Sequence, residues 1–98
     1  MAYPTRQTVK LTAAERDQLR AAATAAGQTV TDYVRAAILA HAETPPAPAP
    51  CTETVQVRLG DAEEKLVARA SERSGVSRSE IVRAAIRAAA EKTTSRAE

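Results

Sequence analysis

The stretch Thr54-Val55-Gln56-Val57-Arg58-Leu59 decides the fold, because apolar and polar side chains alternate along it without a break. This period of two is typical of a half-buried β-strand, in which successive side chains point to opposite faces. One face would carry Val55, Val57 and Leu59, which need a core. The other would carry the hydroxyl, amide and guanidinium groups of Thr54, Gln56 and Arg58. An isolated strand of this length is unstable in water, so the pattern predicts a second strand beside it.

The predicted partner strand lies 48 residues upstream, where the chain matches itself without a gap. The pairs at this offset include Val9 with Val57, Leu11 with Leu59, Glu15 with Glu63, Gly27 with Gly75, and Arg35 with Arg83. The match runs through both halves, so the protein is one unit written twice. We expect repeat 1 over residues 1–43, a linker over 44–53 and repeat 2 over 54–98. Each repeat is too short to bury enough surface alone, so both should fold as one domain.

A first helix is predicted directly after the strand of each repeat. In repeat 1, Thr12 and Glu15 have the spacing of a capping box, and Gly27 is the expected left-handed residue at the end of the helix. Repeat 2 begins its helix at Gly60 and ends it at Gly75. Because glycine has no side-chain hydroxyl, the helix in repeat 2 should start from a poorer cap.

The second helix of each repeat is predicted to begin after Thr29 or Ser77, both of which are good capping residues. Val30, Val34 and Ile38 then recur at helical spacing, so one stripe of the helix in repeat 1 should face the core. We expect these helices to end at about residues 42 and 90. The polar tail over residues 92–98 should lie beyond the last helix.

The segment between the repeats, over residues 44–53, is rich in proline and is expected to be extended polyproline II. Its roughly ten residues at ~3.1 Å each span about 30 Å, enough to bring the second strand beside the first. Cys51 is expected to be an unpaired thiol in this exposed linker. No apolar run approaches the ~20 residues of a membrane span, so we expect a cytoplasmic protein with no membrane partner.

The order of strand, helix and helix in each repeat resembles the ribbon-helix-helix family of the Arc and MetJ repressors. The residues that carry the resemblance are 8–12, 27–31 and 33–37 in repeat 1, and 56–59, 75–79 and 81–85 in repeat 2. Members of that family normally hold one copy per chain and dimerise. The resemblance therefore implies a mainly α fold with a two-stranded antiparallel β-ribbon, in which tandem repeats form an intramolecular pseudo-dimer.

The resemblance also implies that the ribbon enters the major groove of double-stranded DNA and contacts bases through alternate side chains. These would be Arg6, Thr8, Lys10, Thr54, Gln56 and Arg58. The residue types agree with such a role, since Arg or Lys pairs with guanine, Gln with adenine, and Thr with the thymine methyl group. Alternatively, the six side chains are only the solvated face of an amphipathic strand. Because the two repeats differ on this face, we expect an asymmetric DNA site.

Contacts to DNA phosphates are implied at the start of each second helix, where free amides and the helix dipole favour anions. The residues are Thr29, Val30 and Thr31 in repeat 1, and Ser77, Arg78 and Ser79 in repeat 2. Ordinary capping by Thr29 and Ser77 is the alternative. The resemblance further implies that several chains can associate side by side along DNA.

Several functions are compatible with these features. We expect a transcriptional repressor, with a second reading that resembles TraY-type relaxosome accessory proteins of conjugative plasmids and would add a relaxase partner. An antitoxin is disfavoured because only about seven residues follow the last predicted helix. A helical interaction module without DNA would leave the polar strand face unexplained. An enzyme is not expected, because His41 and Cys51 belong to no catalytic constellation and no metal-binding or cofactor-binding motif is found.

Overall fold

Two successive strand-helix-helix units make up the molecule. The computed structural model describes residues 5–45 and 50–96, with side chains through residue 92. The first unit consists of β1 (Thr5–Leu11), α1 (Ala13–Ala25) and α2 (Val30–His41), and the second of β2 (Glu53–Leu59), α3 (Asp61–Ser74) and α4 (Arg78–Arg96). The predicted fold class, mainly α with tandem repeats, is confirmed.

The two strands pair with each other in an antiparallel ribbon. Thr8 lies opposite Gln56, and these two residues also align when the repeats are superposed in sequence. The centre of the ribbon is therefore the centre of a pseudo-two-fold relation between the repeats. On the inner face, Val9, Leu11, Val57 and Leu59 are almost completely buried. The chain thus forms within itself the paired ribbon that the alternation of residues 54–59 predicts.

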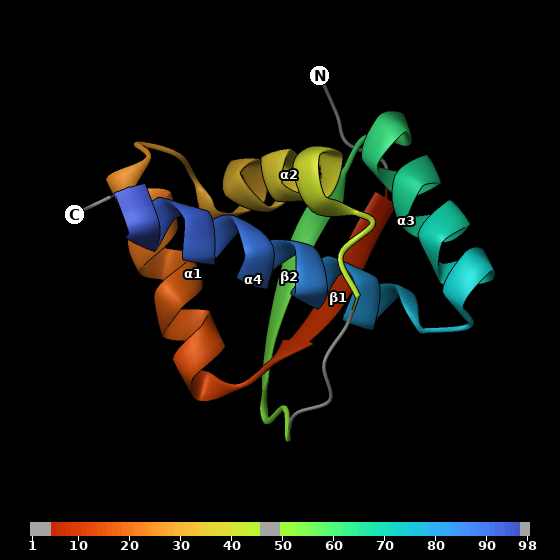
Figure 1. Ribbon diagram of the computed structural model, residues 1–98, viewed down its shortest axis with the longest axis horizontal. Coiled ribbons are helices and arrows are strands. Elements are labelled where there is room, and N and C mark those ends of the chain that lie inside the picture. Colours follow the sequence, from red (N-terminus) through yellow and green to blue (C-terminus); the bar gives the residue numbers. More distant parts are fainter. Residues whose placement is uncertain (1–4, 46–49, 97–98) are drawn as a thin grey trace.

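The helices enclose the inner face of the ribbon in an exchanged arrangement. α2 and α4 lie side by side across the ribbon, while α1 and α3 lie on either side of it (Figure 1). α4 of the second unit packs on β1, and α2 of the first unit packs on β2. The expected stripe is present, because Val34, Ile38, Val82 and Ile86 are buried in one core with the strand residues. Neither unit could bury this core without the other.

The predicted caps are present at the helix ends. Thr12 Oγ1 accepts a hydrogen bond from the backbone N–H of Glu15, and a Glu15 carboxylate oxygen accepts one from that of Thr12. Gly60 has only the second half of this pair, since its N–H donates to Glu63. Gly27 and Gly75 both adopt a positive φ, of 70° and 75°, which favours glycine.

Two expectations from the sequence need correction. α4 continues to Arg96 rather than ending near residue 90, because residues 91–96 contain no glycine or proline to stop it. Cys51 is a free thiol, but it is half-buried at the approach to β2 rather than exposed. Of the expected polyproline II linker, residues 46–49 lie outside the described residues.

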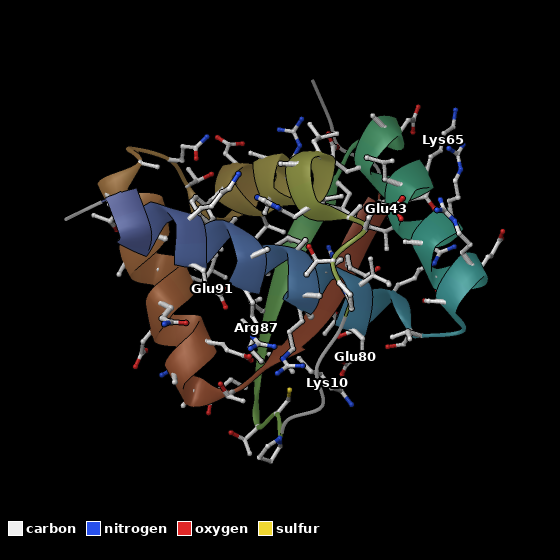
Figure 2. All side chains as sticks on the ribbon, viewed as in Figure 1. Lys10, Glu43, Lys65, Glu80, Arg87 and Glu91 are labelled. Carbon is white, nitrogen blue, oxygen red and sulfur yellow. The ribbon has the colours of Figure 1, made fainter. Side chains whose placement is uncertain are left out.

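A pair of crossed ion pairs joins the two units. Glu15 of α1 accepts two hydrogen bonds of 2.8 Å from the guanidinium of Arg83 in α4, which is only 1% exposed. At the equivalent positions, Glu63 of α3 accepts a hydrogen bond of 3.3 Å from Arg35 in α2. Arg87 adds a second cation beside Glu15, at 3.4 Å (Figure 2). The first unit therefore supplies the counter-ion for both buried charges of the second unit, Glu15 for Arg83 and Arg35 for Glu63.

These contacts control the ionisation of Glu15. Burial alone would raise the pKa of its carboxyl group, but the hydrogen bonds from Arg83 and Thr12 and the charges of Arg83 and Arg87 outweigh burial, and the pKa is lowered. A lowered pKa in the folded state means that the ionised carboxylate stabilises the fold. Its contribution is present above the ordinary value of 4.5 and is lost as the pH falls through the folded value.

Replacing Val57 by Lys tests the register of the ribbon. Val57 is 1% exposed, so Val57→Lys would bury an unpaired ammonium group and should lower the free energy of unfolding by about 3 kcal/mol or more. The matched control is Gln56→Lys, on the exposed face of the same strand. This substitution should change the free energy of unfolding by less than about 0.5 kcal/mol. Urea unfolding followed by circular dichroism measures both, and equal stability of the two variants would refute the register.

Glu15→Gln tests the crossed ion pair through pH. At pH 7 this substitution leaves the buried Arg83 without its main partner and should destabilise the protein by about 3 kcal/mol. As the pH falls from 4.5 through the lowered pKa of folded Glu15, the wild-type carboxylate becomes protonated and loses its contribution, so the free energies of unfolding of wild type and Glu15→Gln should converge. The control is Glu72→Gln at an exposed position on α3, whose difference from wild type should stay small at every pH. A Glu15→Gln difference that does not vary with pH would contradict this account.

Candidate nucleic-acid interface

Six polar side chains project from the outer side of the β-ribbon, and we call this surface the ribbon face. It consists of Arg6, Thr8, Lys10, Thr54, Gln56 and Arg58, all of which are exposed. In the antiparallel register, Arg6 lies opposite Arg58, Thr8 opposite Gln56, and Lys10 opposite Thr54. The structure thus brings onto one surface all six residues that the sequence suggests for base contacts.

The ribbon face is basic and its two ends differ. It carries three cations and no carboxylate. At one end Arg6 and Arg58 are directly opposite each other, and like charges in such a cross-strand pair repel. At the other end Lys10 faces the neutral Thr54. An anionic partner would relieve the repulsion at the first end more than at the second.

The start of α2 lies beside the ribbon face along the edge of β2. Thr31 and three ribbon-face residues, Arg6, Gln56 and Arg58, together with Val57, line a hollow of about 330 Å³. Thr29 caps the helix, because its Oγ1 accepts a hydrogen bond of 3.1 Å from the N–H of Asp32. The amides of residues 30 and 31 belong to the first turn and have no acceptor within the helix. The predicted phosphate-contact residues of repeat 1 are therefore next to the predicted base-contact residues.

The start of α4 lies at the opposite edge, beside β1. Ser79 Oγ accepts a hydrogen bond of 2.9 Å from the backbone N–H of Lys10, so this serine attaches the helix to the outer edge of the strand. Ser77 Oγ accepts a hydrogen bond of 3.3 Å from the N–H of Glu80. Arg78 pairs with Glu64 of α3 at 3.3 Å.

Each helix start also contains a carboxylate that would oppose an approaching anion. Asp32 stands in the first turn of α2 and Glu80 in that of α4. Both are partly compensated by an arginine one turn later, at 3.5 Å for Asp32–Arg35 and 3.3 Å for Glu80–Arg83. Each edge thus has a helix start with one carboxylate and an arginine that pairs with it. The hydrogen bond between the Ser79 hydroxyl and β1 is a structural contact that the sequence pattern does not indicate.

Arg16 and Arg20 are basic residues near the ribbon face that the sequence analysis misses. They extend from α1 and line a hollow of about 170 Å³ together with Thr31, Thr54 and Gln56. Their position depends on packing between elements far apart in the chain. The repeat alignment does contain one signal. Arg16 and Arg20 align with Glu64 and Ala68, so this basic pair occurs in repeat 1 and not in repeat 2.

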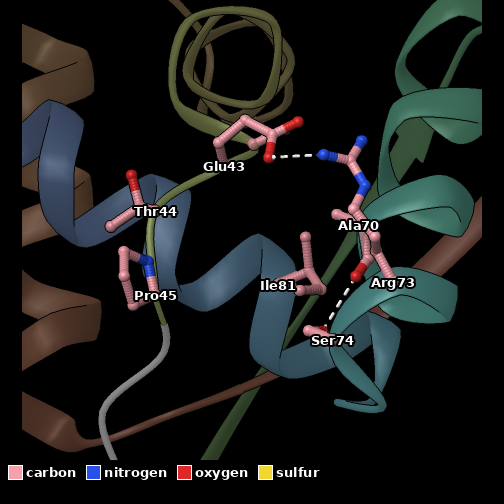
Figure 3. Close-up of a pocket in the computed structure, with 8 residues that line it drawn as sticks. Glu43, Thr44, Pro45, Ala70, Arg73, Ser74 and Ile81 are labelled. Atoms are coloured by element: carbon pink, nitrogen blue, oxygen red, sulfur yellow. Dashed lines mark hydrogen bonds and ion pairs between the residues drawn. The ribbon is translucent and has the colours of Figure 1, made fainter.

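Elsewhere, a hollow of about 260 Å³ lies between α3, the start of α4 and the segment after α2. The ion pair between Glu43 and Arg73, at 3.1 Å, spans its rim, and small or apolar side chains such as Ala70 and Ile81 line the rest (Figure 3). Among the described residues, no group of His, Cys, Asp and Glu side chains is arranged to hold a metal ion. None of the described helices combines the length and apolarity needed to cross a bilayer.

Comparison with known protein families agrees with this architecture. Residues 3–50 match the family model of the NikA-like mobilization proteins, described as mobilization protein NikA. Residues 53–93 match the model of ribbon-helix-helix proteins of the copG family. No curated protein and no solved structure matches the chain. The two matches cover the two strand-helix-helix units in turn, and the paired strands form one ribbon. The chain therefore belongs to the ribbon-helix-helix family, in a tandem form that carries both copies of the motif.

Proposed function

We propose that this protein binds double-stranded DNA sequence-specifically by inserting the ribbon face into the major groove. The observation that carries the proposal is the exposure of six alternate polar side chains, three of them cationic, on a two-stranded ribbon. A two-stranded ribbon fits the width of the major groove, and a helix start lies at each edge of this one. If these side chains were only the solvated face of an amphipathic ribbon, the placement of Arg6 opposite Arg58 would have no explanation.

In the proposed complex, each side chain of the ribbon face reads bases according to its chemistry. Arg6, Arg58 and Lys10 can pair with guanine, while Gln56 suits adenine. Thr8 and Thr54 can donate or accept a hydrogen bond or contact a thymine methyl group. The opposed arginines favour guanines clustered at one end of the site.

The DNA site is proposed to lack two-fold symmetry. In a homodimer both members of the central pair would be the same residue, whereas here they are Thr8 and Gln56. The outer pairs differ as well, since one is Arg6 with Arg58 and the other is Lys10 with Thr54. Such a ribbon presents two unlike halves to the duplex.

The proposed phosphate contacts come from the two helix starts, through Thr29, Val30 and Thr31 on one edge and Ser77, Arg78 and Ser79 on the other. First-turn amides and the positive end of the helix dipole favour a phosphate oxygen. Arg78 would have to exchange its contact with Glu64 for the phosphate. Because Arg78 is about half exposed, this exchange has a small energetic cost.

For the biological role, we favour an accessory protein at a plasmid transfer origin, where a relaxase would be the partner. The match of residues 3–50 to the mobilization family supports this role. A repressor that blocks a promoter is the second candidate, because residues 53–93 match a ribbon-helix-helix model that names no mobilization function. DNase footprinting on a plasmid fragment distinguishes them: protection within the transfer origin supports the first role, and protection of a promoter alone supports the second.

Selection of bound duplexes from a random DNA pool tests the proposed mode of reading. The expected result is a single motif without two-fold symmetry, with guanine preferred toward one end. Its affinity should fall linearly with the logarithm of salt concentration, because bound phosphates release counter-ions. Recovery of no motif from the pool, or binding that is insensitive to salt, would overturn the proposed function.

Arg58→Ala tests one base contact. Removal of a guanidinium that pairs with guanine should weaken binding to the selected site by about 1–3 kcal/mol and relax the preference at one base pair. Lys92→Ala, an exposed cation near the end of α4, is the control and should leave that preference unchanged. Fluorescence anisotropy with the selected duplex and its single-base variants measures both. Unaltered discrimination in Arg58→Ala would remove Arg58 from the reading residues.

A further inference from the structure

One corner of the molecule places two arginines of a first helix beside the free amides at the start of a second helix, and these arginines have no equivalent at the opposite corner. The corner lies where α1, the start of α2 and β2 meet, around the hollow of about 170 Å³. Arg16 and Arg20 enter it from α1, Val30 and Thr31 from α2, and Thr54 and Gln56 from the ribbon face. It thus adjoins the surface proposed to bind DNA and adds a helix that the proposed interface does not use.

The two arginines in this corner have different surroundings. Arg16 is held by Glu53 at 2.6 Å and touches Asp17 at 3.5 Å, so its charge is largely compensated within the protein. Its Nε atom is buried and has no hydrogen-bond partner among the described residues. Arg20 is exposed and forms no ion pair within the described part of the chain. Arg20 is therefore the cation that this corner can offer to a ligand.

The α2 start adds directional donors to this charge. The N–H of Asp32 is already taken by Thr29, but the amides of Val30 and Thr31 have no acceptor within the helix. Both of these residues line the same hollow as Arg20. A guanidinium together with first-turn amides is a combination that suits a phosphate group.

The equivalent corner of repeat 2 is built differently. Glu64 stands at the position of Arg16, and Ala68 at that of Arg20. Glu64 forms an ion pair with Arg78 at the start of α4. The second corner therefore has a cation that is already paired and no counterpart of Arg20.

We propose that Arg20 adds a cationic contact to the DNA backbone phosphate at the amides of residues 30 and 31, on the β2 side of the ribbon, and that the phosphate contact at the start of α4, on the β1 side, has no such addition from α3. The inference rests on the proposed function and deepens it, because a contact on one side only fixes which way round the protein lies on its site. Arg20 is thus a positioning residue that acts on the backbone and carries no base preference.

Arg20→Gln provides the test, with Lys92→Gln as a control that removes the same charge at a position far along α4. The slope of log affinity against log salt should become shallower by about 0.9 in Arg20→Gln, the value for one phosphate contact, and should not change in Lys92→Gln. When salt is raised from about 50 to about 200 mM, the affinity of Arg20→Gln should therefore fall by a factor about 3.5 times smaller than the affinity of wild type does. Base preferences in the random-pool selection should stay as in wild type.

Phosphate ethylation interference then locates the contact. Wild type should show, on each flank of the site, a phosphate at which ethylation impairs binding, and in Arg20→Gln only the signal on the flank contacted by β2 should weaken. Unchanged slope and interference in Arg20→Gln would overturn this inference while leaving DNA binding intact. Failure of wild type to bind any duplex would instead overturn the proposed function, so the two failures are distinguishable.

Discussion

The pairing of two unlike strands within one chain is the constraint on which the whole structure depends. The inner face of the ribbon buries Val9, Leu11, Val57 and Leu59, and no single strand of this length could remain ordered with such a face exposed. The exchange of second helices, α4 onto β1 and α2 onto β2, closes the core from both repeats at once. The crossed carboxylate-arginine pairs then fix each second helix against the first helix of the other repeat. Residues of both repeats therefore share one core.

Much of this arrangement could be predicted from the sequence because it follows from local rules. Alternation over residues 54–59 gives the strand and the identity of its exposed side, and the repeat offset gives its partner. Capping residues such as Thr12 and Thr29, and the glycines with positive φ, mark helix ends through contacts within a few residues. Signals of this kind need no knowledge of the three-dimensional arrangement.

The parts that could not be predicted depend on contacts between distant segments. Glu15 looks like a capping residue only, and nothing in its neighbourhood shows that it also neutralises Arg83, 68 positions away. Ser79 likewise resembles a residue of a helix start, yet its hydroxyl serves the outer edge of β1. The presence of Arg20 beside Thr54 and Gln56 depends on how α1 packs against the ribbon. The sequence therefore indicates which surface matters but not which neighbours shape it.

The central pair of the ribbon has a consequence for how such a protein can evolve. In a symmetric homodimer one codon specifies both members of that pair, so every mutation appears twice in the assembled surface. Here Thr8 and Gln56 are encoded separately although they lie opposite each other. In a gene of this kind, a single mutation changes one strand of the recognition surface and leaves the other strand as it was. New specificities can therefore arise through changes that affect half of the surface at a time.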